Sequence, residues 1–254
     1  MPSTFGAIPE LVGRPRISPP RIPEVHLRAA TLTADLDIRI IHAVDSSMMN
    51  AVIPGVILAA GASARMGCPK ALLPLASGET FLTRIVRILR RGGVEDVVVV
   101  GGCDAGQIAE ALGGETDPPR LAINPDWRTG QLSSLVAGLR LIDHPGVDAM
   151  LMTLIDVPLV STQTVRVLLE TYRRTRAPIV RPAHGGLHGH PVIFDRAMFD
   201  ALRHADRTVG AKSVVRAFGS QIVDVDVDDE GAFADIDTPE DYERLIGRPV
   251  PSWE

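Results

Sequence analysis

The chain has 254 residues, of which 45% are hydrophobic and 4% aromatic, and its formal net charge is −5. This length allows one large α/β domain or two small ones, with a core built mostly from aliphatic side chains. The acidic balance argues against nucleic acid or an anionic membrane as the main partner, and the sequence has no apolar run of the roughly 18 residues that a membrane-spanning helix needs.

Residues 1–50 are predicted to be an N-terminal extension, and residues 51–254 to be the functional domain. The first 25 residues are rich in Pro and Arg and have no periodicity, so we expect them to be poorly ordered or loosely packed. Residues 36–41 are apolar enough to form a short strand. Met48 and Met49 stand just before the first clear element, so translation starting there is an open alternative.

From residue 54 onward, apolar runs typical of strands alternate with segments of helical spacing. Strands are predicted over 56–60, 96–100, 121–123, 149–155, 179–180 and 191–194. Helices are predicted from Phe81 to the glycines at 92–93, and over 107–112, 133–141 and 162–171. This alternation predicts βαβ units and a single α/β, Rossmann-like domain with a mainly parallel, mixed sheet flanked by helices.

A glycine-rich segment with two cations, LAAGASARMGCPK at residues 58–70, follows the first predicted strand. It therefore lies at the carboxyl edge of the sheet, where open α/β folds bind ligands. Its small residues let backbone N–H groups approach a phosphate, and Arg65 and Lys70 can neutralise a triphosphate. A P-loop is excluded because Cys68, and not Lys, follows Gly67. An ordinary turn with two solvated cations is the alternative.

Three further segments carry polar residues at predicted element ends. In NPDWRTGQLSSL, residues 124–135, a helix begins near Gly130, and its free N–H groups favour an anion or polar ligand unless the Ser pair is a plain N-cap. Asp156 ends a strand shortly before Pro158 and is well placed for Mg²⁺ or for a turn. Thr238-Pro239 predicts the N-cap and first residue of a last helix.

Cysteine and histidine spacing gives little support for a zinc site or a disulfide framework. Cys68 and Cys103 are isolated, which fits a reducing cytoplasm, where we expect the protein to be. Three histidines occur in RPAHGGLHGHPV, residues 181–192, but no fourth zinc ligand is evident. The acidic run at 224–229 is interpreted as a solvated strand and turn without a site.

The segment at residues 59–70 resembles the signature loop of the MobA-like nucleotidyltransferases, Ala-Ala-Gly-x-Ser-x-Arg-Met-Gly-x-x-Lys. It is most similar to the branch that contains CTP:molybdopterin cytidylyltransferase, and the resemblance spans residues 54–247. It implies that Leu58, Ala59, Ala60 and Gly61 wrap the NTP while Arg65 and Lys70 hold its phosphates. The guanylyl branch has Gly where this chain has Ala60, which favours CTP.

The resemblance also assigns roles to the other segments. It implies that Asn124 and Ser134 lie near base and ribose, and that Asp156 and Asp237 bind Mg²⁺, or Mn²⁺ in its place. Asp237 directly precedes Thr-Pro as the family's second metal carboxylate does, although Asp235 is close by. Ile155 departs from the family, which has a small residue there. On the acceptor side the resemblance implies Arg181, Gly189 and His190, with Arg181 and His190 expected to meet an acceptor phosphate. The alternative is a flexible loop in which His190 only packs.

These observations predict a Mg²⁺-dependent nucleotidyltransferase that transfers CMP from CTP to a phosphorylated acceptor, the molybdopterin cofactor, and releases pyrophosphate. Arg65, Lys70 and Asp156 are the predicted catalytic residues. Alternatives are a guanylyltransferase, a sugar- or polyol-phosphate nucleotidyltransferase, and a non-catalytic accessory protein that binds the molybdenum cofactor. A molybdoenzyme or its chaperone is the expected protein partner, with no nucleic acid or membrane partner.

Overall fold

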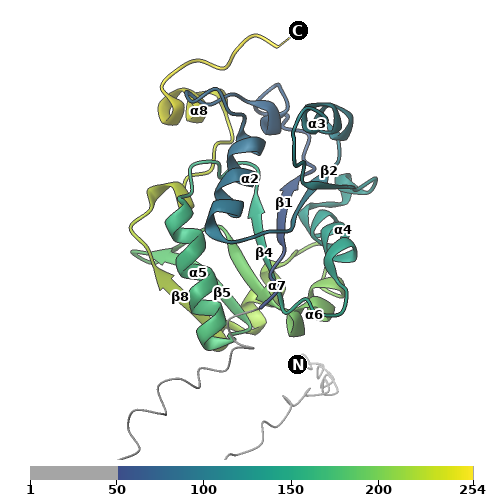
Figure 1. The fold of residues 1–254 in the computed structure, drawn as a ribbon, viewed down its shortest axis with the longest axis vertical. Helices are drawn as coiled ribbons and strands as arrows, with labels where there is room; N and C mark the ends of the chain where they lie inside the picture. The colour runs from purple at the N-terminus through teal and green to yellow at the C-terminus, as the bar shows by residue number, and fades with distance from the viewer. Residues whose placement is uncertain (1–50, 254) are drawn as a thin grey trace, which may run out of the picture. The chain divides into compact units, whose positions relative to one another are not determined.

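The computed structural model describes residues 51–253, which form a single mixed sheet with helices on both faces (Figure 1). The predicted N-terminal extension over residues 1–50, the candidate strand at 36–41 and the candidate start residues Met48 and Met49 lie outside the described residues. Those predictions therefore stay predictions. Across the described range, every helix is too short or too polar to cross a membrane.

The sheet has eight strands in the order β3-β2-β1-β4-β7-β5-β6, with β8 paired to β5. The parallel part consists of β1 (Gly55–Ala59), β2 (Val97–Gly101), β3 (Arg120–Ile123) and β4 (Ala149–Leu154). Next to it, β7 (Val192–Asp195) runs antiparallel to both β4 and β5 (Ile179–His184). The edge is completed by β6 (Leu187–His188), antiparallel to β5, and β8 (Ile222–Asp226), parallel to it. The predicted mainly parallel, mixed sheet is confirmed.

The four helices predicted between residues 81 and 171 are all present. They are α2 (Phe81–Gly92), α3 (Ala105–Leu112), α4 (Gln131–Ile142) and α5 (Thr162–Thr175). The chain then forms α6 (Phe199–Arg203) and α7 (Lys212–Ala217), which the sequence patterns did not predict, and the last helix α8 (Pro239–Ile246). Short 3-10 turns are η2 (Lys70–Leu72), η3 (Trp127–Thr129), η4 (Arg196–Met198), η5 (Gly219–Gln221) and η6 (Glu230–Ala232).

The sheet divides the core into two layers because successive strand residues point to opposite faces. In β1, Ile57 and Ala59 pack into the layer with α2, α5 and α8, whereas Val56 and Leu58 pack into the layer with α4, α6 and α7. All five residues of β1 are buried. This burial on both faces explains why the central strands appear in the sequence as unbroken apolar runs.

Helix α8 begins as its sequence predicts. The Thr238 hydroxyl accepts a hydrogen bond from the backbone N–H of Asp241, whose carboxylate in turn accepts one from the Thr238 N–H, and Pro239 is the first helical residue. This capping box satisfies N–H groups that the first turn leaves free. It fixes the chain direction at residues 235–237, which lie just upstream.

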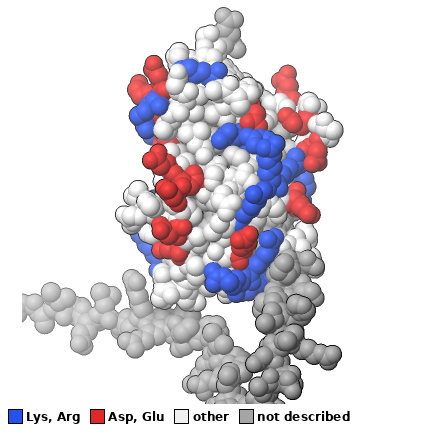
Figure 2. All heavy atoms as spheres, turned by 60° about the vertical axis from the view of Figure 1, so that its left-hand side comes forward, with Lys and Arg blue, Asp and Glu red and all other residues white. Residues whose placement is uncertain are grey.

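The acidic run at residues 224–229 is a strand and turn with Asp224, Asp226 and Asp228 exposed as predicted, and two of its carboxylates also bind other parts of the protein. Asp224 on β8 pairs with Arg181 on β5 at 2.7 Å. Asp229 accepts hydrogen bonds from the Ser161 N–H at 2.9 Å and from the hydroxyl of Thr164, at the start of α5. On the face that carries α5 and β8, acidic and basic side chains form separate small groups (Figure 2).

Candidate active site

The glycine-rich loop between β1 and η2 is braced from within by Ser63. The Ser63 carbonyl accepts hydrogen bonds from the N–H groups of Met66 at 2.9 Å and Gly67 at 3.1 Å, and its hydroxyl accepts one from the Lys70 N–H at 3.2 Å. Met66 and Cys68 are buried in the core and anchor the loop. Gly67 has a φ of 76°, a left-handed conformation that glycine adopts without a Cβ clash.

This bracing leaves a row of backbone donors unused. Within the described part of the chain, no backbone or side-chain acceptor is bonded to the N–H groups of residues 61–65. Consecutive free N–H groups in a tight turn form an anion-binding concavity. The loop is therefore suited to hold phosphate oxygens at the carboxyl end of β1.

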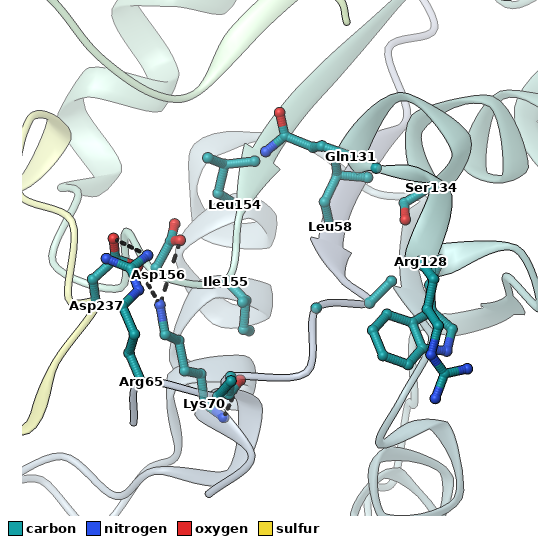
Figure 3. Close-up of a pocket in the computed structure, with 16 residues that line it drawn as sticks. Leu58, Arg65, Lys70, Arg128, Gln131, Ser134, Leu154, Ile155, Asp156 and Asp237 are labelled. Carbon is teal, nitrogen blue, oxygen red and sulfur yellow. Dashed lines mark hydrogen bonds and ion pairs between the residues drawn. The ribbon is translucent and has the colours of Figure 1, made fainter. Parts of the chain in front are cut away.

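A cavity of about 440 Å³ opens beside the loop, and we call it the first cavity (Figure 3). Its walls are the loop, the segment from η3 to the start of α4, the end of β4 and Asp237. The predicted nucleotide-binding residues in its lining are Leu58, Ala60, Gly61, Arg65, Lys70 and Ser134. Ala59 is absent from the lining because it points to the opposite face of β1. Asn124 is also outside it.

Four charged side chains meet at one side of the first cavity (Figure 3). The Lys70 ammonium lies 2.5 Å from Oδ1 of Asp237 and 3.7 Å from Oδ2 of Asp156. Arg65 donates to the other Asp237 oxygen, Oδ2, at 2.8 Å. Lys70 is nearly buried, whereas 68% of the Arg65 side chain is exposed. The two predicted cations and the two predicted metal carboxylates thus form a single cluster.

The two carboxylates reach this cluster from distant parts of the sequence. Asp156 lies in the turn after β4, two residues beyond Leu154, and Asp237 directly precedes Thr238, the N-cap of α8. The two segments are joined where the Ile236 N–H donates to the Asp156 carbonyl at 2.8 Å. Because Ile236 is fully buried, the side chains of residues 235 and 237 on either side of it point away from the core. Asp237 lines the first cavity, and the exposed Asp235 does not.

Among the described residues no group of three or more His, Cys, Asp or Glu side chains could hold a metal ion, so a cation at this cluster would depend on the Asp156–Asp237 pair. Burial raises the pKa of Asp156, Lys70 opposes that effect, and Asp235 and Asp237 add to it. The Lys70 hydrogen bond lowers the pKa of Asp237. Oδ1 of Asp156 is buried and bonded to no other group of the described residues. Because Mg²⁺ is typically bound by one or two carboxylates plus phosphates and water, Asp156 and Asp237 fit it without a third protein ligand.

Asn124 supports the first cavity from behind. Its amide nitrogen donates to the hydroxyls of Ser133 at 2.8 Å and Ser134 at 3.0 Å, and its carbonyl accepts from the Asp126 N–H at 3.0 Å. Of these residues, only Ser134 lines the cavity. The alternative that the Ser pair caps α4 is wrong, because the N-cap is Gly130 and Ser133 instead donates to the carbonyls of Asp126 and Gly130.

Several cavity residues were not identified from the sequence. Trp127 and Arg128 line the first cavity, and the Arg128 guanidinium carbon stacks 4.2 Å from the centre of the Trp127 ring. Gln131 and Leu154 also line it, as does Ile155 at the position where the chain departs from the family. The segment of residues 124–135 contains Trp127, Arg128 and Gln131, but its residue spacing does not identify them as cavity residues.

The residues predicted for the acceptor side line a second cavity of about 710 Å³. It contains Arg181, Gly189 and His190 and shares Gly130 and Gln131 with the first cavity. A Cβ on Gly189 would lie 2.2 Å from the Ala232 carbonyl oxygen, so this position requires glycine for packing. Burial lowers the pKa of His190 to about 4, and its Nδ1 has no partner among the described residues.

A family model described as the MobA-like NTP transferase domain matches residues 55–224 of this chain. The nicotine blue oxidoreductase of Paenarthrobacter nicotinovorans is 34% identical over 206 residues, which cover 76% of this chain and 96% of that protein. The molybdenum cofactor cytidylyltransferase of Escherichia coli is 24% identical over 188 residues, which cover 74% of this chain and 92% of that enzyme.

Solved structures give the same fold. The crystal structure of Rv0371c from Mycobacterium tuberculosis superposes with a TM-score of 0.67 and 28% identity, covering 78% of this chain and 98% of that chain. A structure of Rv0371c in complex with manganese gives a TM-score of 0.62 and 27% identity, covering 78% and 99%. The likeness therefore extends over nearly the whole of that protein.

Proposed function

We propose that this chain, which belongs to the MobA-like NTP transferase family, transfers CMP from CTP to a phosphorylated acceptor in a Mg²⁺-dependent reaction. The acceptor we propose is the molybdopterin cofactor, and pyrophosphate is the second product. The chain is a nucleotidyltransferase by family, so the proposal concerns the nucleotide, the metal and the acceptor.

One observation carries the proposal: Arg65, Lys70, Asp156 and Asp237 meet at the wall of one cavity beside a loop with free N–H groups. Moving a nucleotidyl group needs little covalent chemistry from the protein. It needs a triphosphate held in line with an acceptor and compensation of the charge that develops on the leaving pyrophosphate. Two cations and a metal-binding carboxylate pair supply that compensation.

In the proposed reaction, an oxygen of the acceptor phosphate attacks the α-phosphorus of CTP. A new phosphoanhydride P–O–P bond forms, and the bond between the α-phosphorus and the bridging oxygen to the β-phosphate breaks. The electron pair of that bond leaves with pyrophosphate. Lys70, nearly buried in the cluster, and Arg65, largely exposed and paired with Asp237, stabilise the negative charge on the departing group.

Asp156 and Asp237 are the residues we propose for holding the metal. When bound there, a divalent cation would neutralise charge on the phosphates of the nucleotide. The manganese complex of Rv0371c supports a divalent metal in a relative of the same fold. Mg²⁺ in place of Mn²⁺ is our proposal, since both are hard cations that accept carboxylate and phosphate oxygens.

CTP is proposed over GTP because of Ala60. Its side chain is almost completely buried, and it lines the first cavity at the point where the guanylyl branch has glycine. The loop is packed tightly here, because Gly102 lies so close that a Cβ on it would be 2.4 Å from the Ala60 carbonyl oxygen. An extra methyl group in such a turn reduces the room for a base, which favours the smaller pyrimidine.

The oxidoreductase named among the relatives is the competing function for this chain. A hydride transfer has no need for a cation pair joined to two carboxylates beside a phosphate-binding turn. This chain contains all four residues of that cluster, which supports the transferase. The non-catalytic accessory role is disfavoured for the same reason.

A screen of purified full-length protein tests the proposal. Pyrophosphate release is measured with Mg²⁺, each of the four NTPs and a panel containing molybdopterin, a sugar 1-phosphate and a polyol phosphate. The expected result is release that needs both CTP and the molybdopterin. Preference for GTP, or for a sugar or polyol phosphate, would replace our choice of substrate. Redox turnover of nicotine blue, with no pyrophosphate release for any pair of NTP and acceptor, would overturn the transferase.

A further inference from the structure

The Lys, Arg, Asp and Glu side chains that line the second cavity are all basic. Cationic side chains reach it from two sides: Arg181 on β5, and Arg207, Lys212 and Arg216 around α7. No Asp or Glu is among its lining residues, although the whole chain has a net charge of −5. A concave surface lined by one sign of charge concentrates ligands of the opposite sign.

The cation on the β5 side, Arg181, is already compensated. Arg181 donates to Asp224 at 2.7 Å, and Nε2 of His188 lies 3.3 Å from the same carboxylate. In contrast, Arg207, Lys212 and Arg216 are exposed and take part in no ion pair or hydrogen bond with the protein within residues 51–253. We call these three residues the cationic wall. The uncompensated positive charge of the second cavity therefore lies on this wall.

The cationic wall is built on ordered backbone. Its first part is a turn in which Asp206 accepts bonds from the N–H groups of Thr208 and Gly210, each at 2.8 Å. Its second part is α7, which is anchored by the buried Val214. Lys212 and Arg216 are four residues apart on one helix face, a spacing at which like charges repel each other. This pair of like charges therefore does not stabilise α7.

Apolar side chains form part of the remaining lining of the second cavity, beside the polar Gln131, His188, His190 and Thr208. Met152, Val192 and Phe194 come from the sheet and Val215 from α7. A site with apolar walls and a few placed charges suits a ligand with a ring system and an anionic end. The cavity meets the first cavity at Gly130 and Gln131, so a ligand in it can reach the nucleotide.

From these features we propose that Arg207, Lys212 and Arg216 bind the anionic end of a ring-bearing acceptor and set acceptor specificity. This proposal rests on the function proposed above and deepens it. It differs from the expectation that Arg181 meets the acceptor phosphate, because Arg181 is held by Asp224. It also separates a ring-bearing phosphomonoester from a polyol phosphate, which has no apolar body to place against Val192 and Val215.

A matched pair of fluorescent probes tests the cationic wall without relying on turnover. Riboflavin 5′-phosphate is a ring-bearing phosphomonoester, and riboflavin is the same ring without the phosphate. Fluorescence titration of the full chain should give tighter binding of the phosphorylated probe. Each of Arg207→Gln, Lys212→Gln and Arg216→Gln should weaken that binding by about tenfold, the scale of one lost charged hydrogen bond. Riboflavin binding should not change.

Two controls make the outcome specific. Arg174→Gln removes an exposed cation of α5 outside the second cavity and should leave both affinities unchanged. Saturating CTP should not displace the phosphorylated probe, because CTP is assigned to the first cavity. Three results would each overturn the proposal for the cationic wall. They are equal affinities for the two probes, equal losses of affinity for both probes in the variants, and displacement of the phosphorylated probe by CTP.

The same titrations distinguish this proposal from the proposed function. If the probes behave as expected but no nucleotide is transferred to any acceptor, the transferase proposal fails and the anion site remains. If CMP transfer occurs and the three variants keep wild-type KM values for the acceptor and wild-type probe affinities, the cationic wall is wrong and the transferase remains.

Discussion

The backbone N–H of Ile236 donates a 2.8 Å hydrogen bond to the carbonyl oxygen of Asp156. This hydrogen bond joins the turn after β4 to the segment before α8. It leaves the side chains of Asp156 and Asp237 on either side of the Lys70 ammonium, at 3.7 and 2.5 Å. The geometry of the proposed metal site therefore depends on a backbone contact between residues about 80 positions apart in the sequence.

Asp156→Asn and Asp237→Asn should each lower kcat/KM by about 10²-fold or more, because the metal contributes several kcal/mol and 1.36 kcal/mol corresponds to tenfold. The double variant should be little worse than the worse single variant, since the residues act as one unit. Pyrophosphate release measures both. Asp235→Asn is the matched control and should keep most activity. Full activity in either single variant would remove the carboxylate pair from the mechanism.

Lys70→Ala should lower kcat by about 10²-fold, the scale for one lost electrostatic stabiliser, and should affect nucleoside binding less. It also removes the ion-pair partner of Asp156 and leaves Asp237 paired with Arg65 alone. Because both carboxylates are partly exposed, we expect a loss of only about 1–2 kcal/mol in the free energy of unfolding. Added Mg²⁺ should recover part of this loss. Urea denaturation with and without Mg²⁺ checks it, and a wild-type kcat would place Lys70 outside the site.

Ala60→Gly should shift nucleotide preference toward GTP. The wild-type chain is expected to have a higher kcat/KM for CTP than for GTP, and removal of the methyl group should narrow the ratio by about tenfold, the lower end for one methylene in a pocket. Competition between the two nucleotides in one reaction gives the ratio directly. A wild-type preference for GTP, or an unchanged ratio in the variant, would show that Ala60 does not select the base.

His190 should make the fold less stable in acid. In the folded chain its pKa is lowered to about 4 by burial, so it stays neutral. An unfolded His takes up a proton near pH 6.5, so this part of the stability is complete above pH 6.5 and is lost progressively toward pH 4. The loss is at most about 3 kcal/mol at 1.36 kcal/mol per pKa unit.

His190→Gln should therefore flatten the decline of unfolding free energy between pH 6.5 and 4, as measured by urea denaturation at each pH. His184→Gln is the comparison, because His184 is 58% exposed and contacts Asp226 at the surface. Equal pH dependence in the wild type and the His190→Gln variant would contradict the burial effect.

A chain starting at Met49 should fold and turn over at a rate similar to that of the full chain. The preceding residues contain none of the site residues and lack core periodicity. Thermal unfolding and pyrophosphate release of the two chains, side by side, check this. A large drop in either quantity would show that the N-terminal residues belong to the domain.

Much of the fold could be predicted because the central strands and the helices around them carry strong local patterns. The buried runs of β1, β2 and β4 and the capping residues of α8 are examples. The patterns did not predict α6 and α7, which have five and six residues and too few turns to show periodicity. β5 is longer than predicted because its later residues are ordered by pairing with β6 and β8.

The site could be predicted where a motif carries its own geometry, as in the loop that contains Arg65 and Lys70. Long-range relations could not be predicted. The Arg181–Asp224 pair depends on strand pairing across about 40 residues, and the placement of Asn124 behind Ser134 depends on side-chain packing. The cationic wall was missed for the same reason, since Arg207, Lys212 and Arg216 form no motif.

The most direct test of the central claim is ³¹P NMR of the full chain with Mg²⁺, CTP and phosphorylated molybdopterin. We expect the α-phosphorus signal of CTP to be replaced by signals of a new phosphoanhydride that joins this phosphorus to the acceptor phosphorus. One equivalent of pyrophosphate should appear with it, and both should form about 10²-fold more slowly, or slower still, in Asp156→Asn. Unchanged CTP, or CDP with inorganic phosphate as the only products, would contradict nucleotidyl transfer by this site.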